Sequence, residues 1–162
     1  KELQSETNDK NKIAHIDLSE YPLLPNQEDI WLAEKLSSGK IKFRIVFGLK
    51  SNKKLEEHTL KNALEYLRSH HIALSLLFSL TSKGLSQYVD KNKPLPIYYE
   101  KVIDESSLIS KIREIENSEF DLFNEYAWRV HLIPLSNGKQ IYLFNFHHII
   151  FDGWSVKLFF NE

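Results

Sequence analysis

The chain contains 162 residues, of which 42% are hydrophobic and 27% are charged, so it can bury one hydrophobic core and has the length of one domain or lobe. Its formal net charge of -1 offers no general attraction to nucleic acid or to anionic lipid, and no local basic patch stands out. The absence of cysteine excludes disulfides, thiolate catalysis and Cys-ligated zinc.

No apolar run approaches the roughly 18 residues of a membrane span, and the N-terminus lacks the apolar core of a signal peptide. We therefore expect a cytoplasmic protein with neither a nucleic-acid nor a membrane partner. Methionine is absent even at position 1, so we expect these residues to belong to something longer.

The N-terminal residues are polar and charged. Residues 1–12 are expected to form a flexible tail or linker, and residues 13–162 to form one folded lobe. A short strand is expected over Ala14–Leu18 at the start of this lobe.

Helical periodicity and end signals predict helices along the whole lobe. In the first, Asn26 is expected to be the N-cap, and Ile30, Trp31 and Leu36 to form the apolar face. The predicted helices run from Asn26 to Ser38, from Lys53 to His70, from Asp104 or Ser106 to about Phe120, and from Gly153 to at least Glu162.

Apolar segments with turn signals between them predict the strands. Lys83-Gly84 and Asn137-Gly138 indicate two hairpins. Strands are expected over Ile41–Leu49, Ala73–Leu80, Leu85–Val89, Ile97–Ile103, Ala127–Leu135 and Gln140–Phe146. Because hairpins and helical crossovers are both present, the fold class is α/β, a mixed β-sheet with packed helices.

Two adjacent histidines, His147 and His148, follow the last apolar strand, and Asp152-Gly153 then turns the chain into the final helix. Side chains alternate along a strand, so the two imidazoles should point to opposite faces. Only one of them can then face a given cleft, while the other packs.

Other interpretations of this stretch stay open at this point. Two adjacent histidines on a strand are often ordinary strand residues. A metal site made of His147, His148 and Asp152 is disfavoured because neighbouring strand positions diverge, and we expect no metal. Trp154 is expected to pack against the core and Ser155 to cap the final helix.

The stretch His147–Ser155, HHIIFDGWS, resembles the HHxxxDG motif of the condensation domains of non-ribosomal peptide synthetases, members of the chloramphenicol acetyltransferase-like superfamily. Three further stretches resemble motifs of the same family, in the same order. Tyr21–Trp31 is similar to the first motif, His70–Phe78 to a weakened second motif, and Phe120–Leu122 with Trp128–Val130 to the FDL…PLxR segment. The resemblance covers the first half of a condensation domain.

The resemblance implies the N-terminal lobe of a two-lobed chloramphenicol acetyltransferase-like fold, without its C-terminal lobe. Condensation domains join an acyl or peptidyl thioester on one carrier protein to the amine of an aminoacyl thioester on another. The phosphopantetheine arms of the carrier proteins would deliver both substrates, and no cofactor is bound directly. The partners implied are carrier proteins, the missing C-terminal lobe and adjacent synthetase domains.

The second histidine of the motif is the catalytic one in the family, which assigns that role to His148. His148 would accept the proton of the attacking amine or position that amine. His147 would be structural, Asp152 would shape the loop, and Gly153 would let backbone approach the substrate. For the intact parent, an acyltransferase of the same superfamily that uses a coenzyme A thioester is also open.

The chain departs from the family pattern at the second motif. The arginine that pairs with the motif aspartate in the family aligns with Ser75, and a serine cannot replace a charged fork. Arg129 is the candidate replacement partner for Asp152. Without the second lobe we expect little or no catalysis from this chain. The alternative function is a non-catalytic half domain that docks a carrier protein or a neighbouring domain.

Overall fold

The computed structural model describes residues 20–37, 42–82 and 84–162. The expected tail over residues 1–12 and the expected strand over Ala14–Leu18 lie outside these residues. Within the described ranges, no helix combines the length and the apolar character needed to cross a membrane.

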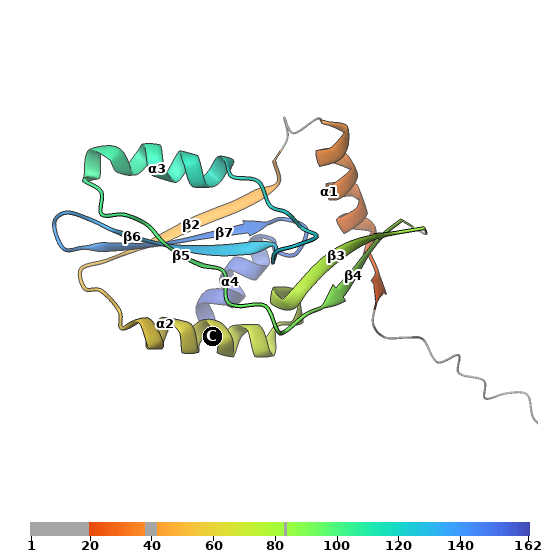
Figure 1. Cartoon of the computed structure of the whole chain (residues 1–162), viewed down its shortest axis with the longest axis horizontal. Coiled ribbons are helices and arrows are strands. Elements are labelled where there is room, and N and C mark those ends of the chain that lie inside the picture. The colour runs from red at the N-terminus through yellow and green to blue at the C-terminus, as the bar shows by residue number, and fades with distance from the viewer. Residues whose placement is uncertain (1–19, 38–41, 83) are drawn as a thin grey trace, which may run out of the picture.

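A mixed sheet with the strand order β2-β7-β6-β5 forms the centre of the molecule (Figure 1). Neighbouring strands are antiparallel except β5 and β6, which run parallel. The strands are β2 (Arg44–Ser51), β5 (Ile97–Tyr99), β6 (Trp128–Pro134) and β7 (Gln140–His147). The predicted mixed sheet is confirmed, and β7, which ends at the first motif histidine, lies in its interior.

Helices cover both faces of this sheet, with α3 on one face and α2 and α4 on the other (Figure 1). Leu143 of β7 packs with Ile115 of α3, whereas the next residue, Phe144, packs with Leu64 of α2. Successive side chains of β7 therefore enter two cores, as strand alternation requires. The helices are α2 (Glu57–His70), α3 (Glu105–Asn117) and α4 (Gly153–Asn161).

A smaller antiparallel sheet, with the order β1-β4-β3, lies beside α1 (Figure 1). The sequence did not separate these strands from the main sheet. Both predicted hairpins are confirmed, and Gly84 and Gly138 have the positive φ values, 113° and 79°, that favour glycine. The elements are β1 (Tyr21–Pro22), α1 (Pro25–Leu36), β3 (Leu76–Thr81) and β4 (Gly84–Val89).

The predicted start and apolar face of the first helix are partly wrong. The N-cap is Leu24, and Pro25 occupies the first helical turn, where its missing N–H costs nothing. Ile30 and Trp31 pack against a buried cluster as predicted. Leu36 does not belong to this face, because 83% of its surface is exposed.

Other predicted boundaries also change. The strand expected over Ile97–Ile103 ends at Tyr99, and the helix expected to reach about Phe120 ends at Asn117. The helix expected from Lys53 begins only at Glu57, and the hydroxyl of Ser51 instead forms a local turn with the backbone of Lys53. The strand expected from Ala73 begins only at Leu76, because Ile72–Ser75 form a 3-10 helix.

A cluster of aromatic rings joins α4 to the main sheet. The ring of Phe146 stacks on that of Phe151 with 3.8 Å between centroids, and it lies 5.7 Å from Phe47 and 5.4 Å from Phe159. Phe146 is fully buried. This packing fixes the loop after β7 from its apolar side.

Replacing Phe146 with alanine should lower the free energy of unfolding by about 3–5 kcal/mol, because the substitution leaves a cavity in the aromatic cluster. Chemical denaturation of the two proteins measures this difference. Phe160→Ala is the matched control, since 46% of the Phe160 surface is exposed, and its effect should be clearly smaller. Equal effects of the two substitutions would contradict the central position of Phe146.

Candidate functional site

A cleft of about 590 Å³ lies where α1, β4 and the loop after β7 meet. These three segments are far apart in the sequence. Gln27 and Asp29 come from α1, Gln87 from β4, and His148 and Asp152 from the loop. The cleft therefore brings together the residues of two motifs that the sequence analysis singled out separately.

His147, the last residue of β7, does not line this cleft and is only 1% exposed. Its backbone N–H donates to the carbonyl of Ala127 over 2.8 Å, and its carbonyl accepts from the N–H of Ile150 over 3.2 Å. Its Nδ1 accepts from the N–H of Ile149 over 3.1 Å, and its Nε2 lies 2.9 Å from Oε2 of Glu34. Every polar group of His147 thus has a partner.

These contacts define the tautomer of His147. An amide N–H only donates, so the Nδ1 atom that accepts from Ile149 carries no proton. The ring proton must then be on Nε2, where it is donated to the Glu34 carboxylate. His147 is a neutral, fully engaged imidazole without a free nitrogen for chemistry.

His148 is half-buried and faces the cleft. Its backbone N–H donates to the carbonyl of Phe43 over 2.9 Å, next to the start of β2. Within the described ranges, no hydrogen bond to its ring is recorded. The two imidazoles therefore separate as predicted, although His148 lies in the turn after β7 and not on the strand, and only the imidazole of His148 reaches the cleft.

Gln27 of the first motif holds the histidine loop to α1. Its Nε2 donates to the carbonyl of Ile149 over 3.0 Å, and its Oε1 accepts from the backbone of Leu24 over 2.9 Å. The side-chain amides of Gln27 and Gln87 also pair, since Nε2 of each donates to Oε1 of the other over 3.1 Å. Gln87 donates in addition to the carbonyl of Pro22. This buried amide pair connects α1, β4, β1 and the loop.

Glu34 is the site residue that sequence reasoning missed. One carboxylate oxygen pairs with His147, and the other accepts from the N–H of Phe43 over 3.0 Å and from Nη1 of Arg44 over 3.3 Å. Burial raises the pKa of the Glu34 carboxyl, but the hydrogen bond from His147, the backbone N–H of Phe43 and the charge of Arg44 together outweigh burial and lower it. Its spacing could have indicated a role, because Glu34 follows the motif residue Gln27 by seven residues and therefore lies on the same face of the helix.

Asp152 is exposed and is the N-cap of α4. Its Oδ1 accepts from the backbone N–H of Ser155 over 2.8 Å and from the Ser155 hydroxyl over 2.7 Å. These two hydrogen bonds, together with the nearby charge of His148, lower the pKa of the Asp152 carboxyl. The predicted capping role of Ser155 is therefore wrong, since Ser155 is the donor and Asp152 the cap.

Arg129 does not pair with Asp152. It lies in β6, where it donates to the Ser118 hydroxyl over 2.9 Å, forms an ion pair with Glu125 and stacks over the ring of Phe120 at 4.3 Å. These contacts hold the segment before β6 against the sheet. The hypothesis that Arg129 replaces the family's arginine is not supported by this geometry.

The structure also places the remaining motif residues. Trp154 is 81% exposed, so its predicted packing role is wrong. Gly153 is the first residue of α4, and no atom lies within 4 Å of where a Cβ would be, so the chain itself does not require glycine there. Ser75 is fully buried, and its hydroxyl has no hydrogen-bond partner among the described residues.

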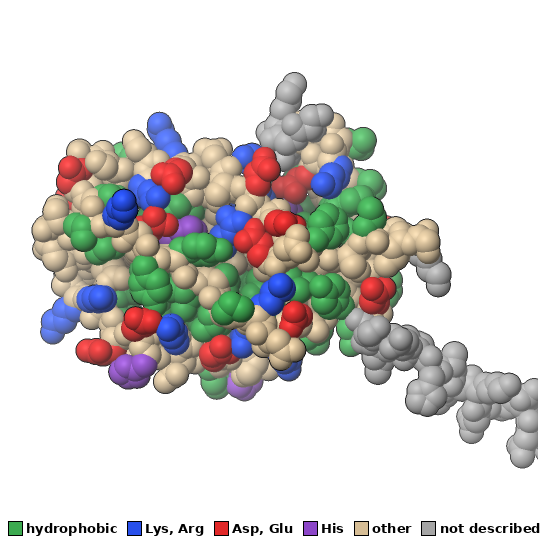
Figure 2. Space-filling view, in the orientation of Figure 1, with side chains coloured by type: hydrophobic (Ala, Val, Ile, Leu, Met, Phe, Trp, Pro, Cys, Tyr) green, Lys and Arg blue, Asp and Glu red, His purple; other side chains and the backbone are tan. Residues whose placement is uncertain are grey.

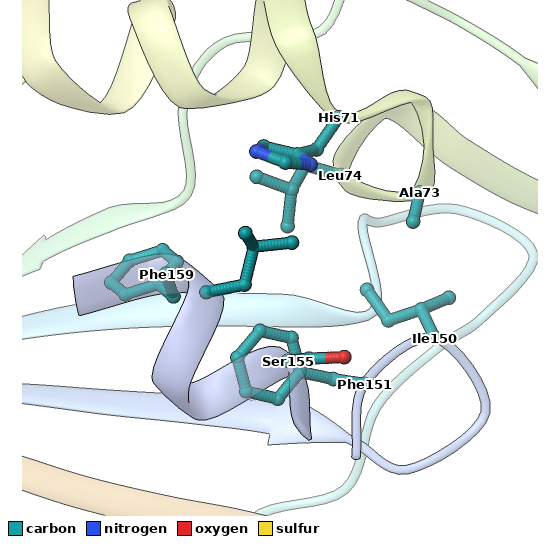
Figure 3. Close-up of a pocket in the computed structure, with 8 residues that line it drawn as sticks. His71, Ala73, Leu74, Ile150, Phe151, Ser155 and Phe159 are labelled. Atoms are coloured by element: carbon teal, nitrogen blue, oxygen red, sulfur yellow. The ribbon is translucent and has the colours of Figure 1, made fainter. Parts of the chain in front are cut away.

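A smaller apolar pocket of about 70 Å³ lies between the 3-10 helix and α4 (Figure 3). His71 and Leu74 line it from one side and Phe159 from the other. Ile150 and Phe151 line both this pocket and the cleft that contains His148. The histidine loop is thus part of the wall between the two spaces, together with Ala73 and Ser155.

No set of three or more His, Asp or Glu side chains within the described ranges is arranged to hold a metal ion. His147 could not join such a set, since both of its ring nitrogens are engaged.

Acidic and basic side chains are interspersed over the face of the molecule in Figure 2.

A mixed sheet flanked by helices, with an HHxxxDG loop at the end of an interior strand, defines the N-terminal part of a chloramphenicol acetyltransferase-like fold. The family model for the condensation domain matches residues 18–162, so the chain belongs to the condensation domain family. The resemblance noted from the motifs is confirmed.

Relatives of the chain are peptide synthetases. It is 28% identical over 141 residues to cyclosporin synthetase simA of Tolypocladium inflatum, which covers 84% of this chain and 1% of that protein. It is 27% identical over 149 residues to bacitracin synthase 1 of Bacillus licheniformis, which covers 88% of this chain and 3% of that protein.

Solved structures show the same fold. The complex of the X-domain and OxyB from teicoplanin biosynthesis matches with a TM-score of 0.77 and 24% identity, over 86% of this chain and 30% of that chain. The starter condensation domain of rhizomide synthetase in complex with C8-CoA matches with a TM-score of 0.75 and 20% identity, over 87% of this chain and 33% of that chain. The chain spans about a third of these solved chains and a few per cent of the synthetases.

Replacing Asp152 with alanine should lower the free energy of unfolding by about 1 kcal/mol, because α4 loses its N-cap. Asp152→Asn keeps an acceptor oxygen for Ser155 and should have a much smaller effect. Urea denaturation of the three proteins tests the difference. If the two variants are equally destabilised, the contribution of Asp152 is its charge and not its cap.

The carboxyl of Glu34 should make stability depend on pH. Because its folded-state pKa lies below the ordinary value of 4.5, its contribution is complete above that pH and is lost as pH falls through the folded-state pKa. The difference in unfolding free energy between wild type and Glu34→Gln should therefore shrink from neutral pH to about pH 3. Urea denaturation across this range measures it, and a difference that grows in acid would show the opposite sign.

Proposed function

We propose that this chain forms the N-terminal lobe of a non-ribosomal peptide synthetase condensation domain, with His148 as its catalytic residue. The observation that carries this proposal is the different environment of the two motif histidines. His147 has no free nitrogen, whereas His148 presents its imidazole to a cleft large enough for a thioester arm.

The reaction is the formation of an amide bond from a thioester. The amine nitrogen of the acceptor attacks the thioester carbonyl carbon, the C–N bond forms, and the C–S bond breaks. The amine loses a proton, and the thiol of the donor phosphopantetheine leaves. Imidazole is well suited to accept that proton, or to orient the amine and stabilise the tetrahedral intermediate, near neutral pH.

Positioning carries a large share of the rate in this proposal, since a thioester is already activated. The backbone at and beside His148 is hydrogen-bonded to three other segments: Ile149 to Gln27 of α1, His148 to Phe43 and His147 to Ala127. A side chain on such a loop keeps its direction without a ligand. This rigidity is what a proton acceptor with a fixed target requires.

The partners in this proposal are an upstream and a downstream carrier protein, whose phosphopantetheine arms bring the substrates to the cleft. A second lobe and adjacent synthetase domains complete the assembly, which we place in the cytoplasm. Because this lobe supplies only one wall around His148, we expect little catalysis from the chain alone.

A second candidate is a non-catalytic half domain that docks a carrier protein. The observation that favours it is Ser75, which leaves Asp152 without the arginine that the family supplies at this position. Asp152 is nevertheless held by Ser155, so the loop geometry does not depend on that arginine. Immunoblotting of source cells separates the candidates: a band far above 19.1 kDa supports a synthetase, and one near it supports the docking module.

His148→Ala should lower the rate of amide formation by about 10²–10⁴-fold in the complete condensation domain that contains this lobe, because the proton acceptor is lost. The assay uses a donor carrier protein loaded with an acyl group and an acceptor loaded with an amino acid, and mass spectrometry detects the product. His58→Ala, on the exposed surface of α2, is the matched control and should be silent. A His148→Ala protein as fast as wild type would exclude this role.

A further inference from the structure

We propose that Glu34 is a positioning residue for His148, acting through the proton on His147. The role in catalysis rests on the function proposed above, whereas the coupling between Glu34, His147 and the loop rests on geometry alone. The mechanism is control of a tautomer: the Glu34 carboxylate selects the form of His147 that the loop needs.

The loop from His147 to Ile150 is a tight turn with His148 at its second position. The N–H of Ile150 donates to the carbonyl of His147 over 3.2 Å, and the N–H of Ile149 donates to Nδ1 of His147 over 3.1 Å. Both hydrogen bonds join His147 to residues that follow His148, so they enclose His148 within the turn. The second one exists only while Nδ1 is unprotonated.

A proton on Nδ1 would place two donors against each other. The N–H of Ile149 would then be buried without an acceptor, which costs about 1–3 kcal/mol. The turn would have to open at the position next to His148, and the direction of the His148 side chain would change. The state of one buried ring nitrogen therefore controls where the cleft imidazole points.

Glu34 selects the correct state because a carboxylate only accepts hydrogen bonds. Its Oε2 is 2.9 Å from Nε2 of His147, which holds the ring proton on Nε2 and leaves Nδ1 bare. The carboxylate itself stays ionised, because Nη1 of Arg44 lies 3.3 Å from its other oxygen. The guanidinium of Arg44 is in turn held over the ring of Phe120, 4.9 Å from its centroid. The pKa of Glu34 is lowered, in agreement with this role.

Glu34 also reaches His148 from the opposite side. Its Oε1 accepts from the N–H of Phe43 over 3.0 Å, and the carbonyl of the same residue accepts from the N–H of His148 over 2.9 Å. One carboxylate thus fixes both neighbours of the cleft histidine, His147 through a side chain and Phe43 through the backbone. Glutamine at position 34 could not do this, because an amide has one accepting oxygen and one donating nitrogen.

Nitrogen-15 NMR of the histidine rings tests the coupling without any substrate. In the wild-type chain, two-bond proton–nitrogen correlations should show His147 protonated on Nε2 and bare on Nδ1. In Glu34→Gln, the proton should move wholly or partly to Nδ1, and the amide of Ile149 and the ring of His148 should shift. Glu28→Gln, an exposed carboxyl on the same helix, should leave all three unchanged.

A merely structural role for Glu34, as the ion-pair partner of Arg44, predicts a different result. Glu34→Gln would then lower stability but leave the tautomer of His147 and the amide of Ile149 as they are, and this result would overturn the proposal. The wild-type spectrum is decisive even if Glu34→Gln does not fold. A proton on Nδ1 of His147 in the native chain would overturn the proposal by itself.

Kinetics in the complete condensation domain then test the catalytic consequence. Glu34→Gln should lower kcat about tenfold or more and change KM for the carrier protein little, because a displaced imidazole affects the transition state and not docking. Glu34→Asp, which keeps two accepting oxygens, should restore part of the rate. An unchanged kcat in Glu34→Gln would overturn the positioning role.

The outcomes also separate this inference from the proposed function. If His148→Ala abolishes amide formation while Glu34→Gln changes neither tautomer nor rate, the function stands and the inference fails. If His148→Ala has no effect, the proposed function fails, and with it the role of Glu34 in catalysis, whatever the spectra show.

Discussion

The imidazole of His147 is held between two groups that are far apart in the sequence, the carboxylate of Glu34 on α1 and the amide of Ile149 in the loop after β7. This buried contact has three structural consequences. It sets the tautomer of the ring, closes the turn around His148 and ties α1 to the main sheet. Most polar groups in a protein interior are paired, and these three consequences depend on each other because they share the two nitrogens of one ring.

Much of the secondary structure followed from local patterns in the sequence. Asn137-Gly138 indicated the turn between β6 and β7, and the separation of His147 from His148 was predicted, although His148 lies in a turn and not on the strand. The small sheet was not predicted, because the partner of an apolar strand is chosen by packing over long sequence separations. The start of α2 was misplaced for a local reason instead, because the hydroxyl of Ser51 forms a turn with the backbone of Lys53 where a helix was expected.

The resemblance to a family identified the residues of the cleft but not the contacts that hold them. Gln27 was matched as a motif residue, yet its bond to the carbonyl of Ile149 depends on how α1 lies against the loop. Glu34 had no motif to mark it, and only its place on the same helix face gave a signal. The prediction for Trp154 was wrong for a different reason. A large apolar residue is usually buried, but here Trp154 lies exposed in the first turn of α4.

The capping of α4 has a consequence for the conditions under which the loop keeps its shape. An arginine–aspartate pair near the surface is weakened by dissolved salt, which screens charges beyond a distance of about 10 Å at 0.1 M. Asp152 instead accepts hydrogen bonds from an uncharged hydroxyl and a backbone amide. Contacts to neutral donors make this end of the histidine loop less sensitive to ionic strength than an ion pair with a guanidinium would be.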